Sequence, residues 1–245
     1  MSSNSTKASN KTASPPTSKP YGRINQKRIQ RRQNNDSGEF LLIWERPLGL
    51  NETARASARI SLNSLDDFVK FAVELNEVPI KSDKGGKDVV VDWAFLDGFD
   101  TGGKMHVDAN GLQMIDKKLN YRKEFPFRSN NTVPANFYPI TSAIAIKSSN
   151  MSSDGGKRER QITIMNDRSQ GGSAGLRGQR NIEIMQNRRT KKWDKYGVDE
   201  GINDLDEFGK GIQVPVSYFM FMNDKNSSNP RAFKSMQRAH QRRID

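Results

Sequence analysis

The chain has 245 residues, of which 40 are Lys or Arg and 28 are Asp or Glu, so its formal net charge is +12. It contains no Cys and only two His, His106 and His240, which excludes a disulfide framework, a thiolate zinc site and a cysteine nucleophile. No apolar run approaches the roughly eighteen residues that span a membrane. Residues 1–20 also lack the apolar core of a secretory signal peptide.

The N-terminal segment 1–39 is predicted to be a disordered basic tail. It carries eight basic and two acidic residues, and residues 1–20 are mostly Ser, Thr, Asn and Lys with three prolines. Such a segment buries too little apolar surface to offset its ordering entropy. The basic run 23–32 is compatible with nucleic-acid binding, an anionic surface or a localisation signal, but we favour a solvated tail. Residues 40–61 are left open as a linker or a first strand.

The middle of the chain reads as β-structure. Short runs rich in β-branched or alternating apolar residues are separated by turn signals that contain Gly, Asn and Asp. We predict strands within 89–93, 140–146, 161–165, 181–185 and 212–222. The only helix-like pattern between residues 60 and 222 is the short stretch 112–119. The pattern predicts an all-β fold, an antiparallel sandwich or barrel over residues 62–229.

The last of these runs has apolar residues on both of its faces, which is typical of a strand in the middle of a sandwich. Pro215 lies inside this run and predicts either an edge strand or a bulge, because proline donates no ladder hydrogen bond. Residues 230–245 carry five basic residues and one acidic residue. They are predicted to form a basic tail or a short helix.

Residue types alone assemble no catalytic site. The sequence has no Gly-x-Ser-x-Gly elbow, no P-loop and no His-Glu-x-x-His motif. Asp97 and Asp100 lie three apart in a glycine-rich stretch, where solvated turn residues are the simpler reading. His106 lies in a predicted strand and is interpreted as structural.

Five blocks of sequence are more specific than this background. They follow one another along the chain as Asp108-Ala-Asn110-Gly111, Asn120-Tyr121-Arg122, Tyr138-Pro139-Ile-Thr-Ser142, Asp167-Arg168-Ser-Gln170-Gly171 and Glu183-Ile-Met185-Gln-Asn-Arg188-Arg189. From the residues alone, Asn110 and Gly111 suit a tight hairpin because both tolerate positive φ. Gly171 and Gly172 suit a loop whose backbone approaches another surface closely.

In order and spacing, these blocks resemble the C-terminal β-domain of class II α-mannosidases, glycoside hydrolase family thirty-eight. The resemblance covers about residues 62–245, roughly three quarters of the chain. It implies a supersandwich of the galactose-mutarotase-like type. Because the family domain continues well past the equivalent of Asp245, it also implies an incomplete sandwich.

The resemblance points to Arg188 and Arg189 as carbohydrate or interdomain contact residues. In the family, this double-Arg hairpin lies where the β-domain meets the catalytic domain, and one Arg approaches the sugar site. Adjacent residues on a strand point to opposite faces, so one of them could enter an interface while the other is solvated. For this arginine pair, a structural salt bridge to a carboxylate is as good an interpretation as a functional contact. Asp167, Arg168, Asn110 and Gly111 are further contact candidates.

The family's zinc and its carboxylate nucleophile belong to an N-terminal α/β domain, and no motif for either occurs in this sequence. A retaining glycosidase needs two carboxyl groups about 5–5.5 Å apart. We therefore expect no cofactor and no catalytic residue in this chain, and a non-catalytic role in mannose metabolism. Expected partners are a mannose-containing glycan or a catalytic α-mannosidase domain. The resemblance implies a lysosomal, vacuolar or Golgi setting, but it leaves localisation open because the sequence shows no signal peptide.

Two other functions are carried as alternatives. A stand-alone carbohydrate-binding module would need exposed aromatic residues, for which Trp93, Trp193 and Tyr196 are candidates. A nucleic-acid or anionic-surface binder would use residues 23–32 and 231–243. This second alternative ranks last because the sequence lacks an aromatic-plus-basic platform.

Overall fold

The computed structural model describes residues 25–33, 36–47, 53–75, 78, 86–95, 99, 101–110, 112–124, 133–151, 157–176, 178, 180–190 and 201–224. These residues form strands and turns with one short 3-10 helix, η2 (Pro134–Asn136). None of the described helical residues forms a segment long and apolar enough to cross a membrane. Predictions for residues 1–24 and 230–245 concern segments outside the described residues.

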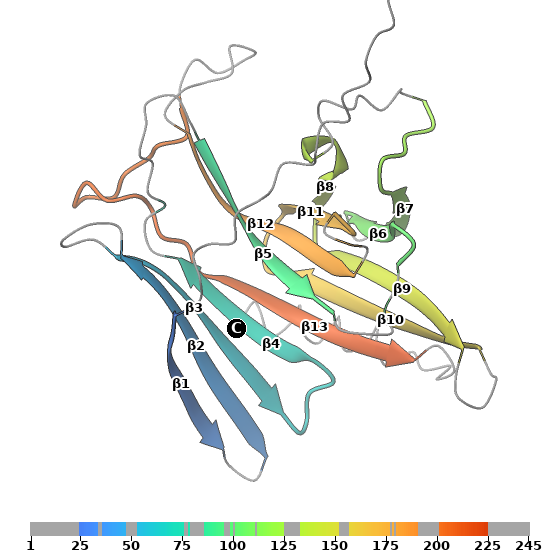
Figure 1. The fold of residues 1–245 in the computed structure, drawn as a ribbon, viewed down its shortest axis with the longest axis horizontal. Helices are drawn as coiled ribbons and strands as arrows, with labels where there is room; N and C mark the ends of the chain where they lie inside the picture. Colours follow the sequence, from blue (N-terminus) through green and yellow to red (C-terminus); the bar gives the residue numbers. More distant parts are fainter. Residues whose placement is uncertain are drawn as a thin grey trace, which may run out of the picture.

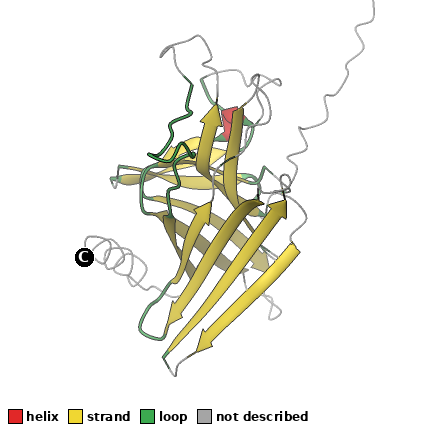
Figure 2. Cartoon of the chain, turned by 90° about the vertical axis from the view of Figure 1, so that its left-hand side faces the viewer, coloured by secondary structure: helices red, strands yellow, loops and turns green. Residues whose placement is uncertain are grey.

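The thirteen strands of the described residues pair antiparallel in two sheets. Their bounds are β1 (Asn25–Gln33), β2 (Ser37–Pro47), β3 (Thr53–Asn63), β4 (Val69–Leu75), β5 (Gly86–Ala94), β6 (Lys104–Ala109), β7 (Gln113–Lys118), β8 (Tyr138–Ile140), β9 (Ala143–Met151), β10 (Lys157–Asn166), β11 (Gln170–Ala174), β12 (Asn181–Thr190) and β13 (Val216–Asp224). The larger sheet has the order β1-β2-β3-β4-β13-β10-β9-β6-β7, and the smaller has the order β5-β12-β11-β8. Figures 1 and 2 show β1–β4 running side by side in the larger sheet. The all-β antiparallel sandwich is confirmed.

Most neighbouring strands in the larger sheet follow each other in sequence and form hairpins. Strand β13, the last of the described strands, is an exception. It lies between β4 and β10 and pairs in regular register with both. The strand begins at Val216, directly after Pro215, because proline cannot donate a ladder hydrogen bond. The prediction that Pro215 marks an edge strand or a bulge is therefore wrong: Pro215 lies before the strand, and the strand is central.

Strand β13 buries both of its faces, as its sequence predicts. Val216, Tyr218 and Met220 face the main hydrophobic core. On the opposite face, Phe219 and Phe221 pack with Ala143, Met165 and the partly buried Phe68 in a second, smaller cluster. The Phe68 and Phe219 rings meet edge to face with their centroids 5.4 Å apart.

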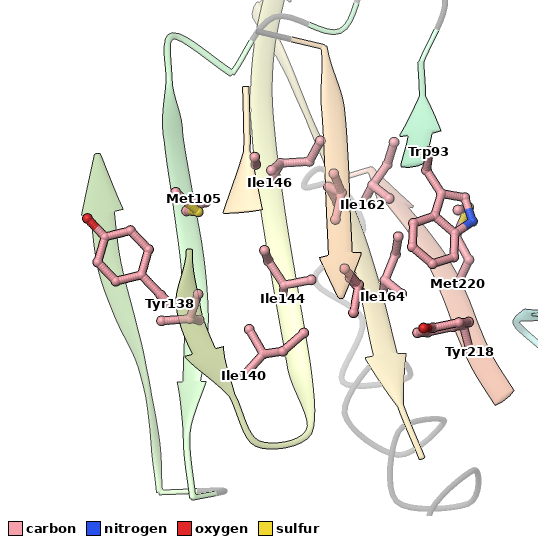
Figure 3. Packing of buried hydrophobic residues seen from close by; sticks show 14 of the residues in the cluster. Trp93, Met105, Tyr138, Ile140, Ile144, Ile146, Ile162, Ile164, Tyr218 and Met220 are labelled. Atoms are coloured by element: carbon pink, nitrogen blue, oxygen red, sulfur yellow. The ribbon is translucent and has the colours of Figure 1, made fainter. Parts of the chain in front are cut away.

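The main core lies between the two sheets. Figure 3 shows a row of isoleucines from β8, β9 and β10 that ends against Trp93 of β5 and Tyr218 of β13. The Trp93 and Tyr218 rings are edge to face with centroids 4.8 Å apart. Fully burying an isoleucine side chain stabilises a fold by about 1.5–3 kcal/mol. Such a row therefore makes a large contribution to holding the two sheets together.

The prediction for the N-terminal part of the chain needs correction. The disordered tail predicted for 1–39 is wrong over residues 25–33, which form β1, and from Ser37 onward, where β2 begins. There the backbone hydrogen bonds of the β1–β2 ladder order a basic segment. Residues 40–61, left open as a linker or a first strand, form most of β2 and β3, which pair with each other.

The helix-like pattern 112–119 folds as strand β7 instead. Asn110 has a positive φ of 55°, which turns the chain tightly and sends it back along β6. Ile115 then pairs with Val107 and packs against the core, while its neighbours are exposed. The run 140–146 is also divided, because its first residue ends β8 in the smaller sheet and residue 143 begins β9 in the larger.

Candidate functional site

The turn between β6 and β7 is bonded to the turn between β8 and β9. Ser142 donates its hydroxyl proton to the Asp108 carboxylate at 2.7 Å, and Thr141 donates to the side-chain oxygen of Asn110 at 3.1 Å. The backbone carbonyl of Ser142 in turn accepts from the Asn166 amide at 3.0 Å. Two blocks that are thirty residues apart in sequence therefore join three turns at one end of the sandwich. Gly111 lies outside the described residues.

A second tie joins the segment after β7 to the helix η2. Asn120 and the fully buried Asn136 form a double hydrogen bond: the Asn120 backbone amide donates to Asn136 Oδ1, and Asn136 Nδ2 donates to Asn120 Oδ1, both at 2.8 Å. Arg122 donates to the Ala135 carbonyl at 2.6 Å. Asn120 accepts the positive φ of 56° that this geometry requires. The Asn-Tyr-Arg block thus holds the chain that leads into β8.

Asp167 and Arg168 fasten the turn after β10 to the start of β13. The Asp167 carboxylate accepts from the Ser217 amide at 2.8 Å and from Arg168 Nε at 2.9 Å. Arg168 also donates to the Pro215 carbonyl at 2.8 Å. The hydrogen bond to Asp167 raises the pKa of the Arg168 guanidinium, which is about half-exposed. The pair therefore closes a local ring of contacts around the beginning of a central strand.

Gly171 and Gly172 lie in strand β11 and not in the loop that we predicted, but their close approach to neighbouring side chains is real. A Cβ at Gly172 would lie 3.0 Å from Ile140 Cδ1, and one at Gly171 would lie 2.9 Å from Met185 Sδ. Beside them, Gln170 donates to the Met185 carbonyl at 2.7 Å. Glycine here lets β11 pack directly onto the core.

The two arginines at the end of β12 have different surroundings. Arg188 forms an ion pair with Asp88 on the paired strand β5, with Nε–Oδ1 at 2.5 Å, and the two side chains are 52% and 45% exposed. Arg189 is partly buried; it donates to the Asn203 side-chain oxygen at 2.7 Å and to the Val78 carbonyl at 2.8 Å. Arg188 thus faces outward, and Arg189 ties two loops to the sheet.

The predicted site residues therefore do not converge on one pocket. Asn110, Asp167 and Arg168 lie at linked turns, whereas Arg188 and Arg189 contact Asp88, Asn203 and Val78. Among the aromatic candidates, Trp93 is 9% exposed and packs in the core, so it offers no platform for a sugar. Trp193 and Tyr196 lie outside the described residues.

Acidic side chains in the described part of the chain show no arrangement for metal binding. No group of three His, Asp or Glu side chains there could hold a metal ion. The buried Glu183 accepts from Asn181 at 3.0 Å, and His106 Nδ1 lies 2.6 Å from the exposed Asp116. Asp97 and Asp100 lie outside the described residues. These residues do not fit a zinc site, so we derive no catalytic step through zinc.

One feature has no counterpart among the sequence predictions. A cleft of about 670 Å³ lies beside β6, β7 and the segment that leads into β8. Its lining includes Lys117 and Arg122 from one segment and Tyr138 from another. A signal was present, since residues 117–124 hold four basic residues and one tyrosine. The residue that completes the cleft, Tyr138, lies sixteen residues after Arg122, and a local pattern does not predict that the two segments meet.

Comparison with known proteins identifies the homologues. The chain is 31% identical over 181 residues to lysosomal α-mannosidase of Bos taurus, covering 74% of this chain and 16% of that protein. It is 33% identical over 164 residues to the Homo sapiens enzyme, 67% of this chain and 14% of that protein. To the α-mannosidase of Canavalia ensiformis it is 26% identical, over 60% of this chain and 14% of that protein. No protein-family model matches the chain.

Among solved structures, an Escherichia coli protein assigned as an aldose 1-epimerase matches with a TM-score of 0.32 and 10% sequence identity. The match covers 80% of this chain and 68% of that one. This overlap is too low to carry an argument, so the galactose-mutarotase-like type stays a prediction.

The fold and the similarities together define a β-sandwich homologous to part of a glycosidase. More specifically, the chain is a homologue of the class II α-mannosidases. It spans about one sixth of the length of the lysosomal relatives that it matches. The resemblance noted in the sequence is thus confirmed for the family.

Proposed function

We propose that this chain is the non-catalytic β-sandwich part of an α-mannosidase-like glycosidase and that it supports a zinc-dependent catalytic domain. The observation that carries the proposal is how the family blocks are used. Asp108, Asn120, Asp167 and Gln170 all direct their side chains to other parts of the sandwich. Residues held in this way shape and stabilise a scaffold.

The acidic groups of these blocks have structural partners. Asp167 accepts from the Ser217 backbone amide and from Arg168, and Asp108 accepts from Ser142. A catalytic acid or nucleophile has to reach the reacting atoms of a substrate. These bonds direct the two carboxylates to the protein itself, which supports a scaffold role.

Arg188 is the residue we assign to contact with a catalytic domain or a mannose-containing glycan. Its guanidinium is half-exposed and already held by Asp88, so its direction is fixed before a partner arrives. A guanidinium positioned in this way can bind a carboxylate or hydroxyl groups with little further loss of side-chain entropy. Arg189, which bonds to Val78 and Asn203, is assigned to holding the loops.

The direct test is hydrolysis of an aryl α-mannoside by the purified 245-residue chain, with and without added zinc. We expect no turnover above the buffer blank in either condition, because this account places the nucleophile and the metal in another domain. A preparation from a host without α-mannosidase activity provides the background. Turnover that co-purifies with the chain through two columns would refute the proposal.

A further inference from the structure

The cleft beside β7 contains two cations that share one aromatic ring. The Lys117 ammonium lies 5.1 Å from the centroid of the Tyr138 ring, and the Arg122 guanidinium carbon lies 5.7 Å from the same centroid. Tyr138 is 8% exposed and belongs to the main core, so this ring is fixed in place. Cation–π contacts of this kind hold both positive groups at the same ring in the cleft lining.

Neither of these two cations forms an ion pair with a described residue, and the cleft lining holds five Lys or Arg side chains against the two carboxylates of Asp116 and Glu124. The ion pairs of the described residues include Arg59 with Glu39, Arg168 with Asp167 and Arg188 with Asp88, all outside the cleft. Arg122 has one further contact, its hydrogen bond to the Ala135 carbonyl. Two adjacent positive charges repel each other unless an anion lies between them. The cleft therefore has an electrostatic preference for an anionic ligand.

The cleft also offers hydrogen-bonding groups suited to an oxyanion. Figure 3 shows Tyr138 at the edge of the core with its hydroxyl directed away from the isoleucine row. In the described part of the chain this hydroxyl makes no hydrogen bond, so it can donate to a ligand. Lys117 and Arg122 add charged donors, and Arg binds phosphate-like groups through two parallel hydrogen bonds.

The rest of the lining suits a small hydroxylated body. A volume of about 670 Å³ is in the range of small-molecule sites. Tyr121 is 55% exposed and presents a ring, and the carboxylates of Asp116 and Glu124 can accept from hydroxyl groups. A sugar ring has both an apolar C–H face and hydroxyl donors.

We propose that this cleft binds the phosphate or sulfate ester of a sugar, with the ester group held by Lys117, Arg122 and the Tyr138 hydroxyl. Tyr121 contacts the sugar ring. The site is separate from the Arg188 surface, so it stands or falls independently of the α-mannosidase scaffold role.

The test is calorimetric titration of the full chain with mannose 6-phosphate, mannose 6-sulfate, mannose and inorganic phosphate at low salt. The proposal predicts binding of at least one of the two esters, weakening as salt is added. Which ester binds more tightly identifies the natural ester chemistry. Absence of binding by both esters, or equal binding by inorganic phosphate or by mannose alone, would overturn the proposal.

Variants locate the binding. Lys117→Gln should weaken ester binding about ten-fold, the usual effect of losing one charged hydrogen bond. Tyr138→Phe removes only the hydroxyl and should weaken binding about three-fold or more, with the ring and the core retained. The matched control Lys147→Gln removes an exposed charge of β9 outside the cleft and should change affinity less than about two-fold.

A further arm separates small esters from nucleic acid. Poly(U) is titrated in competition with the ester. If poly(U) displaces the ester at a lower concentration than the ester itself needs, and if Lys117→Gln weakens poly(U) binding as much as ester binding, the cleft is a nucleic-acid groove and the sugar-ester proposal is wrong. An equal loss with Lys117→Gln and Lys147→Gln would also contradict it, because the attraction would then come from overall charge and not from the cleft.

Discussion

Tyr218 joins the two sheets through a single hydroxyl. It lies on β13 of the larger sheet, donates to Gln186 at 2.8 Å and accepts from Gln170 at 3.0 Å, and both glutamines belong to the smaller sheet. The Tyr218 side chain is fully buried, so its hydroxyl has lost its water, while the two glutamines are partly buried. Removing one partner leaves the others short of a hydrogen bond inside a low-dielectric core.

Tyr218→Phe should therefore lower the free energy of unfolding by about 1–3 kcal/mol. The matched control is Tyr121→Phe, whose hydroxyl is on an exposed side chain and whose loss should change stability by less than about 0.5 kcal/mol. Urea unfolding followed by circular dichroism measures both. Equal effects of the two substitutions would show that the buried hydroxyl is not a tie between the sheets.

The same hydroxyl predicts a loss of stability in alkali. Burial raises the pKa of Tyr218 above its ordinary value of 10.0, so in the range above pH 10 the unfolded chain loses this proton while the folded chain keeps it. The unfolded state is then favoured as pH rises, by up to about 1.4 kcal/mol per pH unit. Tyr218→Phe should flatten the fall in stability between pH 10 and 11.5. Parallel curves for wild type and Tyr218→Phe would contradict this assignment.

The two arginines of β12 differ in what they do for stability. Arg189→Ala should lower the free energy of unfolding by about 1–3 kcal/mol, because the Val78 carbonyl and the Asn203 side chain both lose the hydrogen bond that Arg189 donates. Arg188→Ala removes an exposed ion pair and should cost no more than about 1 kcal/mol. Thermal or urea unfolding of the two variants shows which one loses more stability. A larger loss for Arg188→Ala would show that the roles are reversed.

Among the elements, β11 shows how a short strand depends on glycine. At Gly172, Ile140 and Ile144 of the core occupy the space that a side chain would need. Gly172→Ala should destabilise the fold by about 1–3 kcal/mol, because this part of the core cannot move aside freely. Gly38→Ala in β2 is the control, since its Cβ would meet nothing within 4 Å. Equal unfolding midpoints for both variants would contradict the close packing of β11.

The elements also show how far sequence patterns reach. The runs at 89–93, 161–165 and 181–185 are parts of β5, β10 and β12, because alternating apolar residues fit a half-buried sheet. Strand β1 was missed because its basic composition resembles a tail, and its order comes from pairing with β2. Such pairing is a tertiary effect that a local pattern does not contain.

The candidate site was less predictable for a related reason. Its motifs were visible, but their partners are far away in sequence, as when Arg189 bonds to the carbonyl of Val78, 111 residues earlier. The cleft beside β7 likewise combines residues 117–122 with Tyr138. Neither spacing nor composition specifies such contacts, which arise only when the two sheets close on one core.

At the scale of the whole molecule, the net charge of +12 is unevenly placed. The segments before β1 and after β13, residues 1–24 and 225–245, carry +4 and +5 of it, which leaves +3 for residues 25–224. The two sheets share one hydrophobic core, with Trp93 of the smaller sheet packed against Tyr218 of the larger. A sandwich whose motif residues bond inward is suited to act as a scaffold beside a catalytic unit.

A chimera tests this central claim most directly. In bovine lysosomal α-mannosidase, the segment that matches 181 residues of this chain is replaced by those residues, and aryl α-mannoside hydrolysis is measured. The account predicts an active chimera whose rate falls about ten-fold or more with Arg188→Gln and is unchanged by Lys147→Gln. A chimera that is folded by circular dichroism and unfolds cooperatively, yet hydrolyses no α-mannoside, would contradict the scaffold role.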